Sequence, residues 1–464
     1  MLVFAAAGNA IAGNYLVVFK APHIPAGAAA RIAAAGGTVI GSLDAVGVIA
    51  ASGDASFAAR MAGDASVQAI GPEQMYAKPA DRVIEAAQPE SGPTAADSLL
   101  FFQWDMRRIG APALWSRLPL ATNGVAPTVA VLDVGVADNH PDLSGQVIAS
   151  VATSFCNSSG GPNNSAAYPK YATLIDFDAH PVWNPSDGCT PAAVTYEFHG
   201  THVSGTIAAK FGGGRVVGLD PDTRIAAYKV FDRFRFTDAD GVHDDVGAFD
   251  FPLFVAIVDA AQHGYGVISM SLGGVSSRNS RDGNASWLAW DRVTKYANRL
   301  GTVIVAAAGN NALNVNGTLY NIPSDLPTVM SVSATGWSNL SFMNGQYGPA
   351  PGSFDVLAFY SNFGAAVDIA APGGDCGPQF PNNCEAQYLI LSDSISSTGT
   401  LNYVFAAGTS MATPHVSAVA AVVRSLHPSW TPGEVRAFLK STADPVGPRQ
   451  WFGAGVVNAD RATQ

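Results

Sequence analysis

Charged side chains are scarce in this sequence: they make up 13% of its 464 residues, well below the share in a typical soluble protein. No uninterrupted apolar stretch is long enough to span a bilayer, so we expect no transmembrane helix. Lysine and arginine total 25 against 36 acidic residues, and the net charge of −11 argues against nucleic acid as a partner. The length exceeds that of one small domain and allows a large core.

Cysteine is also rare. The four cysteines are spaced unlike a zinc site, and their even number in a chain of low charge favours disulfides in an exported protein. Of the possible pairings we prefer Cys156–Cys189 and Cys376–Cys384, because each pair lies within one segment rich in Pro, Asn and Gly. Free buried thiols are the alternative.

One serine stands in a setting that favours nucleophilic chemistry. Ser410 lies between a Gly-Thr turn and an alanine-rich stretch that we expect to be helical. The positive end of a helix dipole at that junction favours the negative charge that develops during nucleophilic attack. Taken alone, a serine in this position is more often an N-cap.

Two other segments supply the partners that such a serine needs. His199 lies in Glu-Phe-His-Gly-Thr-His at 197–202, and a neutral imidazole can accept the serine proton and return it to a leaving group. Asp133 ends an apolar, β-branched run, which is typical of a buried strand that delivers an acid at its carboxyl end. That acid could orient the imidazole. A lone His or Asp is more often structural, so the prediction depends on the combination.

The order Asp133, His199, Ser410 and the residues around them resemble the subtilisin-like serine proteases, the subtilases of peptidase family S8. The resemblance rests on Asp133 with Asn-His-Pro-Asp-Leu at 139–143, on His-Gly-Thr-His at 199–202, and on Gly-Thr-Ser-Met-Ala at 408–412. It covers residues from about 100 to 464. It implies an α/β catalytic domain with a parallel sheet, and a triad of Asp133, His199 and Ser410 in a serine endopeptidase.

Two further segments complete the predicted site. Asn310 ends an apolar strand-like run, and the resemblance implies that its amide binds the oxyanion beside the Ser410 backbone N–H. An asparagine that merely ends a strand in a turn is the alternative. Glycines after the run at 267–272 leave the backbone open to an extended peptide, and the resemblance implies that this segment lines the substrate pocket. The predicted substrate-binding residues are Ser271, Leu272, Gly273, Gly274, Ala308 and Gly309.

Residues 14–77 predict a separate small domain. Strand, helix, strand, strand, helix and strand follow one another there, an order that suggests a ferredoxin-like α+β unit. The unit resembles the inhibitor-type propeptide of subtilases, which implies that it assists folding and blocks the cleft until it is removed. An unrelated accessory domain is the alternative. Residues 78–98 predict an exposed linker that contains the maturation cleavage, and 99–464 the subtilisin-like peptidase domain.

The first 13 residues are interpreted as the remnant of a signal peptide. Leu2 to Ala7 is apolar and Ala-Ile-Ala follows at 10–12, but a charged segment ahead of the apolar run is missing. A disordered terminus is the alternative. The expected disulfides agree with a secreted protein, extracellular or periplasmic. We expect a monomer that acts on polypeptides and has its own propeptide as intramolecular inhibitor.

The sequence departs from the family pattern at several places. Val134 follows Asp133, where subtilases usually have a hydroxyl residue. Asp142 matches a calcium ligand of the family, but Lys-Phe-Gly-Gly-Gly at 210–214 replaces the asparagine-containing loop, and glycine has no side-chain oxygen. A structural calcium ion elsewhere remains an expectation, and no organic cofactor is expected. The insert between Asp133 and His199 carries two cysteines and is a candidate rim of the cleft.

Together these features predict a secreted serine endopeptidase made as a self-processed zymogen. A dedicated processing protease for one partner protein is one alternative. A catalytically inactive relative that serves as a binding module is another, although all four catalytic positions are occupied.

Overall fold

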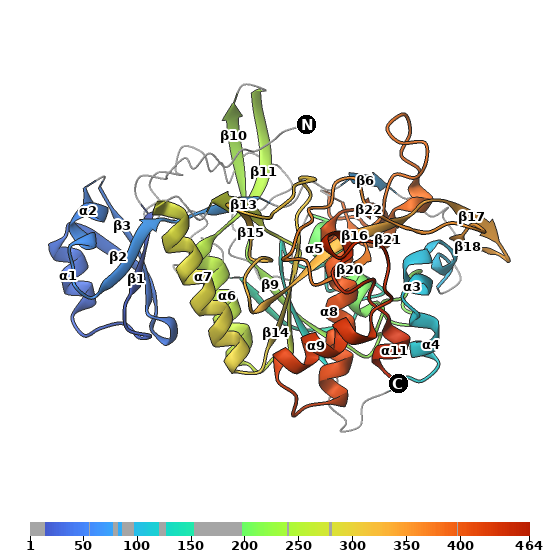
Figure 1. Cartoon of the computed structure of the whole chain (residues 1–464), viewed down its shortest axis with the longest axis horizontal. Coiled ribbons are helices and arrows are strands. Elements are labelled where there is room, and N and C mark those ends of the chain that lie inside the picture. The colour runs from blue at the N-terminus through green and yellow to red at the C-terminus, as the bar shows by residue number, and fades with distance from the viewer. Residues whose placement is uncertain are drawn as a thin grey trace.

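The computed structural model describes residues 14–54, 56–77, 82–85, 97–119, 127–152, 197–238, 241–277, 281–396 and 398–464. A small N-terminal domain, blue in Figure 1, lies beside a large α/β domain and contacts its helix α7 (Arg281–Arg299). The α/β fold with a parallel sheet is confirmed. Among the described helices, none is long and apolar enough to cross a membrane.

An eight-stranded sheet forms the centre of the large domain. Its order is β19-β16-β14-β12-β7-β9-β8, with β20 paired to β16, and only β19 runs antiparallel. The strand that comes first in the chain, β7, therefore lies inside the sheet between β9 and β12. Such a reversal of strand order opens a crevice at the carboxyl ends of the strands, where ligands bind in open α/β sheets. The strands are β7 (Thr128–Asp133), β8 (Val147–Ala152), β9 (Arg224–Lys229), β12 (Val267–Met270), β14 (Val303–Ala307), β16 (Val329–Trp337), β19 (Asp355–Leu357) and β20 (Ile369–Pro372).

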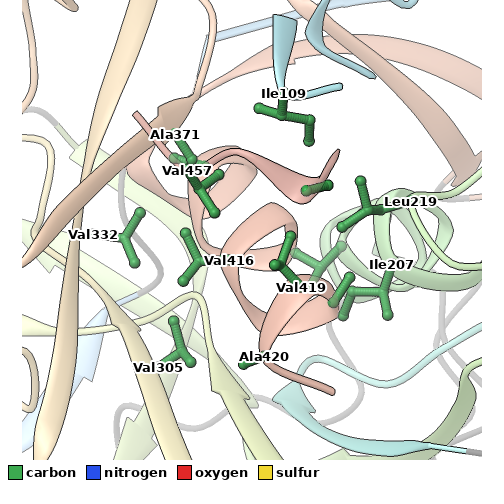
Figure 2. Close-up of a cluster of buried hydrophobic side chains, with 14 of the residues drawn as sticks. Ile109, Ile207, Leu219, Val305, Val332, Ala371, Val416, Val419, Ala420 and Val457 are labelled. Atoms are coloured by element: carbon green, nitrogen blue, oxygen red, sulfur yellow. The ribbon is translucent and has the colours of Figure 1, made fainter. Parts of the chain in front are cut away.

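Helices cover both faces of this sheet, which explains why its strands are apolar at successive positions. Val129 and Val131 of β7 share a core with α5 (His199–Ala208) and α8 (Thr409–Leu426). Ala130 and Leu132 join a second core with α6 (Asp250–Gln262) and α7. Figure 2 shows the first core, in which side chains of α8 such as Val416 and Val419 lie among sheet residues and Ile207 of α5.

The small domain has the predicted order of elements. Its sheet order, β2-β3-β1-β4, is that of a ferredoxin-like unit, and neighbouring strands in it are antiparallel. One face of β1, with Val17 and Phe19, packs on the domain's own helices. The other face, with Leu16 and Val18, shares the core of α6 and α7 in the large domain. The elements are β1 (Asn14–Phe19), α1 (Ala28–Ala34), β2 (Gly37–Leu43), β3 (Val48–Gly53), α2 (Phe57–Ala62) and β4 (Val67–Pro72).

Two short strands follow the small domain and pair with the large one. Strand β5 (Met75–Ala77) lies antiparallel to β11 (Gly241–Phe249), and β6 (Arg82–Glu85) lies antiparallel to β22 (Leu401–Ala407). Residues 78–98 were predicted to form an exposed linker. Residues 82–85 instead form strand β6. Its partner, β22, is more than 300 residues away in the sequence, so no local pattern predicts it.

The remaining elements border the sheet. Strand β10 (Asp232–Asp238) forms with β11 the hairpin that projects at the top of Figure 1. The other strands are β13 (Gly274–Ser277), β15 (Leu319–Ile322), β17 (Leu340–Met343), β18 (Gln346–Pro349) and β21 (Ile390–Ile395). The other helices are α3 (Trp104–Arg108), α4 (Ala111–Trp115), α9 (Pro432–Thr442), α10 (Arg449–Phe452) and α11 (Ala459–Ala462), with short 3₁₀ turns at Asp44–Val46, Leu100–Phe102 and Ala386–Tyr388.

One predicted disulfide is present. Cys376 and Cys384 are bonded across a loop with a sequence separation of 8. The prediction for this pair is confirmed. Cys156 and Cys189 lie outside the described residues, as does most of the insert between Asp133 and His199.

Candidate active site

Asp133 and His199 meet at the carboxyl end of β7. Asp133 is the last residue of that strand and His199 the first residue of α5, and both side chains are buried. The Nδ1 atom of His199 lies 2.8 Å from Asp133 Oδ1 and 2.9 Å from Oδ2. Since a carboxylate only accepts hydrogen bonds, Nδ1 carries the proton and donates it.

Backbone groups hold Asp133 in place. The backbone N–H of Val134 donates to Asp133 Oδ1 at 2.8 Å, so the carboxylate has a second donor although no hydroxyl residue follows it. Gly200 lies so close to Gly135 and Asp133 that a Cβ atom would collide with the Gly135 carbonyl oxygen. The residue after the histidine must therefore be glycine for α5 to begin this close to β7.

Ser410 is the second residue of α8, whose first turn lies beside the end of β12. The Oγ atom of Ser271, just beyond β12, donates to the Ser410 carbonyl oxygen at 2.8 Å. The Ser410 hydroxyl lies 3.5 Å from the Ser271 carbonyl oxygen. Because β12 is the neighbour of β7 and α8 packs on α5, Ser410 comes to the same edge of the sheet as Asp133 and His199.

Asn310 is fixed by the residue that precedes Ser410. The backbone N–H and the Oγ1 of Thr409 donate to Asn310 Oδ1, at 2.9 and 2.7 Å. The side chain of Asn310 therefore presents its oxygen to Thr409, and its amide nitrogen lies on the other branch of the carboxamide. Strand β14 stops at Ala307, so it is shorter than predicted, and Asn310 lies in the loop beyond the strand.

The predicted substrate-binding residues lie in two groups. Ser271, Leu272 and Gly273 follow β12, and Gly274 begins β13, which pairs with β15. Ala308 and Gly309 follow β14, the next strand of the sheet, and Gly309 has a φ of +101°. Both groups extend from the carboxyl edge of the sheet and contact the first turn of α8, through Ser271 and Gly309. Leu272 differs from the other predicted substrate-binding residues, because its side chain belongs to the hydrophobic core shared with α6 and α7.

Several residues near this site were not identified from the sequence. Tyr76 of β5 is buried, and its ring lies against Gly274: a Cβ atom there would be 3.0 Å from Tyr76 Cδ1. Its hydroxyl bonds to Asp250, which begins α6, at 2.7 Å. Glu73 also reaches α6, where it accepts from the Phe251 backbone N–H at 2.8 Å. No sequence motif marks these residues, since each acts only through a contact between the two domains.

The other histidines near the site have structural partners. His202 Nε2 lies 3.1 Å from the Ile390 carbonyl oxygen. His415 Nε2 lies 3.0 Å from Asp105 Oδ2, and its Nδ1 lies 2.9 Å from the Met411 carbonyl oxygen. These contacts agree with the prediction that neither histidine is the general base.

The carboxylate of Asp142, which matches a calcium ligand of the family, has donors of this chain as neighbours. Tyr403 OH and the Arg215 backbone N–H both donate to Asp142 Oδ2, at 2.9 and 3.2 Å, and Gly214 packs directly on the carboxylate. A candidate cation site remains nearby, because ligand atoms of His140, Asp142 and Asp393 lie within 4.8 Å of one another. One ring nitrogen and two carboxylates do not match calcium, which takes six to eight oxygens.

Comparison with known proteins agrees with this geometry. The model of the subtilase family, peptidase S8, matches residues 124–455. Subtilisin E of Bacillus subtilis is 28% identical over 362 residues, covering 78% of this chain and 71% of that protein. An extracellular protease of Xanthomonas campestris is 31% identical over 383 residues, covering 80% of this chain and 56% of the relative.

Solved structures extend the likeness to the small domain. The epidermin leader peptide processing serine protease of Staphylococcus aureus superposes with a TM-score of 0.68 and 23% identity, covering 97% of both chains. Fervidolysin, a keratinolytic enzyme of Fervidobacterium pennivorans, gives a TM-score of 0.64 and 23% identity, covering 97% of this chain and 60% of that one. At 23% sequence identity, these two structures establish the similarity of the fold alone.

Proposed function

Because the chain belongs to the subtilase family of serine proteases, we propose that it is a secreted endopeptidase made as a zymogen that cuts its own linker. Ser410 is the proposed nucleophile, His199 the general base and then acid, and Asp133 the group that orients His199. The observation that carries the proposal is the antiparallel pairing of β5 and β6, which flank residues 78–81, with strands of the large domain, as an extended substrate would pair.

The segments on either side of residues 78–81 both contact the large domain near Ser410. Ahead of residues 78–81, Tyr76 of β5 lies on Gly274, three residues after Ser271. Beyond them, Arg82 of β6 pairs with Ala407, three residues before Ser410. An extended peptide that adds as a strand is a common mode of peptide recognition. We therefore place the scissile bond between residues 77 and 82, at the amino-terminal end of the predicted linker.

The proposed chemistry follows from the arrangement of the buried groups. His199 Nδ1–H is held by Asp133, so Nε2 is the atom that takes the proton from Ser410 Oγ. Ser410 Oγ forms a bond to the carbonyl carbon, and His199 returns the proton to the leaving amine as the peptide bond breaks. Water then releases the acyl group by the same steps in reverse. The amide of Asn310 and the Ser410 backbone N–H are the proposed donors to the oxyanion.

Secretion is supported by one structural feature and one relative. The Cys376–Cys384 disulfide persists in oxidising compartments, and the similar Xanthomonas protein is named an extracellular protease. The small domain, which stays packed on α6 and α7, is the proposed intramolecular inhibitor.

The decisive experiment compares purified wild-type chain with Ser410→Ala. Wild type should yield a new N-terminus between residues 78 and 82 as its first product, and Ser410→Ala should stay intact. On peptide substrates Asn310→Ala should lower kcat by about 10²–10³-fold with little change in KM. Asn311→Ala, its exposed neighbour, is the matched control and should retain full kcat. Equal cleavage in Ser410→Ala would refute the proposal.

A narrower candidate, a processing protease with few targets, is favoured by one observation. The side chain of Tyr76 occupies a specific polar pocket instead of a plain apolar groove. Proteome-wide profiling of the cleavage products distinguishes this candidate from a broadly degradative enzyme.

A further inference from the structure

We propose that the cleft contains a pocket that selects tyrosine, in which Asp250 recognises the phenolic hydroxyl. The inference rests on the proposed peptidase function, and it names the side chain that substrates must present upstream of the cleaved bond. In the zymogen this pocket holds Tyr76 of the chain itself.

The hydroxyl of Tyr76 is surrounded by polar groups. It donates to Asp250 Oδ1 at 2.7 Å and lies 3.0 Å from Ser286 Oγ. Trp290 Nε1 lies 3.1 Å from the same hydroxyl and 2.7 Å from Asp250 Oδ1. All four side chains are at least 96% buried, which means that the phenol has replaced water as the partner of these groups.

The ring of Tyr76 lies in a slot of matching shape. The indole of Trp290 meets it edge-on, with ring centroids 5.9 Å apart and an interplanar angle of 85°. Phe254 supports Trp290 from behind, with centroids 5.1 Å apart. Gly274 also borders the ring, and any larger residue there would narrow the slot.

The pocket belongs to the large domain and not to its occupant. Asp250 begins α6, while Ser286 and Trp290 lie on α7. When the small domain leaves, these residues stay, and the Ser286 hydroxyl and Trp290 indole still donate to Asp250 Oδ1. The pocket is therefore kept in shape and is open to a tyrosine of another chain.

The carboxylate of Asp250 also binds the backbone of the segment that carries Tyr76. Asp250 Oδ2 accepts from the Gln74 backbone N–H at 2.9 Å, two residues before the tyrosine. Pairing of β5 with β11 fixes the rest of the register, with Tyr76 opposite Ala248. An extended peptide of any sequence can supply these backbone bonds, so the choice of side chain depends on the ring slot and on the partners of the hydroxyl.

Phenylalanine fits the slot but lacks the hydroxyl. Asp250 and Ser286 would then lose a partner in a place that water does not reach. Sites built to bond a substrate hydroxyl discriminate strongly against the analogue without it. When phenylalanine occupies the slot, Trp290 and Ser286 still donate hydrogen bonds to Asp250. We therefore expect kcat/KM to be higher for tyrosine by about 10–100-fold, the usual effect of one hydrogen bond to a charged group.

The test uses the mature wild-type enzyme and quenched fluorescent peptides with the sequence of residues 73–85. One peptide has Tyr at the position of Tyr76, one has Phe and one has O-methyltyrosine, which keeps the ring but cannot donate. The expected order of kcat/KM is Tyr far above Phe, and Phe above O-methyltyrosine. This comparison needs no variant, so a folding defect cannot obscure it.

Variants of the pocket then assign the effect to residues. Asp250→Ala should bring the ratio of kcat/KM for Tyr and Phe close to one, whereas Asp291→Ala, on α7 next to Trp290, should leave the ratio unchanged. Equal rates for the Tyr and Phe peptides in wild type, or a ratio that survives Asp250→Ala, would overturn the pocket and leave the peptidase function standing. Failure to hydrolyse any peptide or casein would instead overturn the proposed function.

Discussion

Three buried titratable residues meet beside the active-site helix α5. His140 Nδ1 lies 3.4 Å from Asp393 Oδ1 and 3.9 Å from Asp142 Oδ2. The Nε2 of His140 faces the Asn402 carbonyl oxygen at 3.1 Å, so Nε2 is the protonated nitrogen when the ring is neutral. Burial, followed by the neighbouring charge of Asp142, raises the pKa of Asp393 well above its usual range. Burial also lowers the pKa of His140, so the neutral forms of both His140 and Asp393 are favoured.

The raised pKa of Asp393 makes stability depend on pH. A carboxyl whose pKa is higher in the folded state stabilises the fold at low pH, and that contribution is lost as the pH rises above its unfolded value near 4. In Asp393→Asn this loss of stability at high pH disappears, because an amide does not ionise. The amide N–H can also donate to Asp142 at every pH. In a Ser410→Ala background we expect Asp393→Asn to be more stable than its parent at pH 8, by about 1–3 kcal/mol, and not at pH 4.

Urea denaturation at the two pH values measures this difference. Asp393→Asn that is less stable than its parent at pH 8 would contradict the prediction. That result is what a cation bound by His140, Asp142 and Asp393 would produce, since the variant removes one of its charged ligands.

At the scale of elements, α8 carries Ser410 and is anchored by the short helix α3. Asp105 of α3 and His415 of α8 form a buried pair at 3.0 Å, and the second ring nitrogen of His415 faces the Met411 carbonyl oxygen. Both ring nitrogens thus lie beside oxygen acceptors. A buried pair of this kind fixes one arrangement of two helices, because neither partner is satisfied without the other.

Removing one partner should therefore be costly. We expect Asp105→Ala to lower the free energy of unfolding by about 3–5 kcal/mol, measured by urea denaturation in the Ser410→Ala background. The matched control is Asp291→Ala, which breaks a more exposed pair with Lys295 on α7 and should change stability by less than about 1 kcal/mol. Similar effects of the two substitutions would show that the buried pair does not anchor α8.

At the scale of the whole molecule, the small domain is held by a shared core and by one buried acid. Glu73 accepts from the backbone N–H of Phe251 in the first turn of α6, where the helix dipole favours negative charge. Burial outweighs this effect and raises the pKa of Glu73 from 4.5 to about 8, with a further contribution from the charge of Asp250. Burial also raises the pKa of Asp250 to about 6.

The docked small domain therefore holds a proton that it loses when it leaves. Docking is most favourable below the ordinary pKa of glutamate and weakens as the pH rises from about 4.5 to about 8. After the linker is cut, we expect the small domain to leave faster at pH 8 than at pH 5, with affinity falling by at most about tenfold per pH unit for this group.

Size-exclusion chromatography and the time course of activation at several pH values measure this release. Glu73→Gln should flatten the pH dependence, while Glu434→Gln, in the exposed capping box of α9, should leave it unchanged. A pH profile that Glu73→Gln does not alter would show that other groups control the release.

The sequence by itself indicated the fold class and the elements that carry Asp133 and Ser410. Asp133 ends a run of buried apolar residues and Ser410 stands at a helix start, as the local pattern predicted. His199 begins α5, a helix that was not predicted from the sequence. The order of strands and helices in the small domain was also readable, because hydrophobic periodicity is a local property. The close pair Cys376–Cys384 followed from its short loop.

Only the tertiary structure decided how distant segments meet. Strand β6 exists because β22 offers it an edge, and Tyr76 is a pocket occupant because Asp250 and Trp290 lie on helices of another domain. Glu73 and Asp393 are unremarkable in sequence, and their pKa values are raised only where folding removes water from them. Pairing between domains and desolvation both depend on neighbours far away in the chain, which no local pattern of residues encodes.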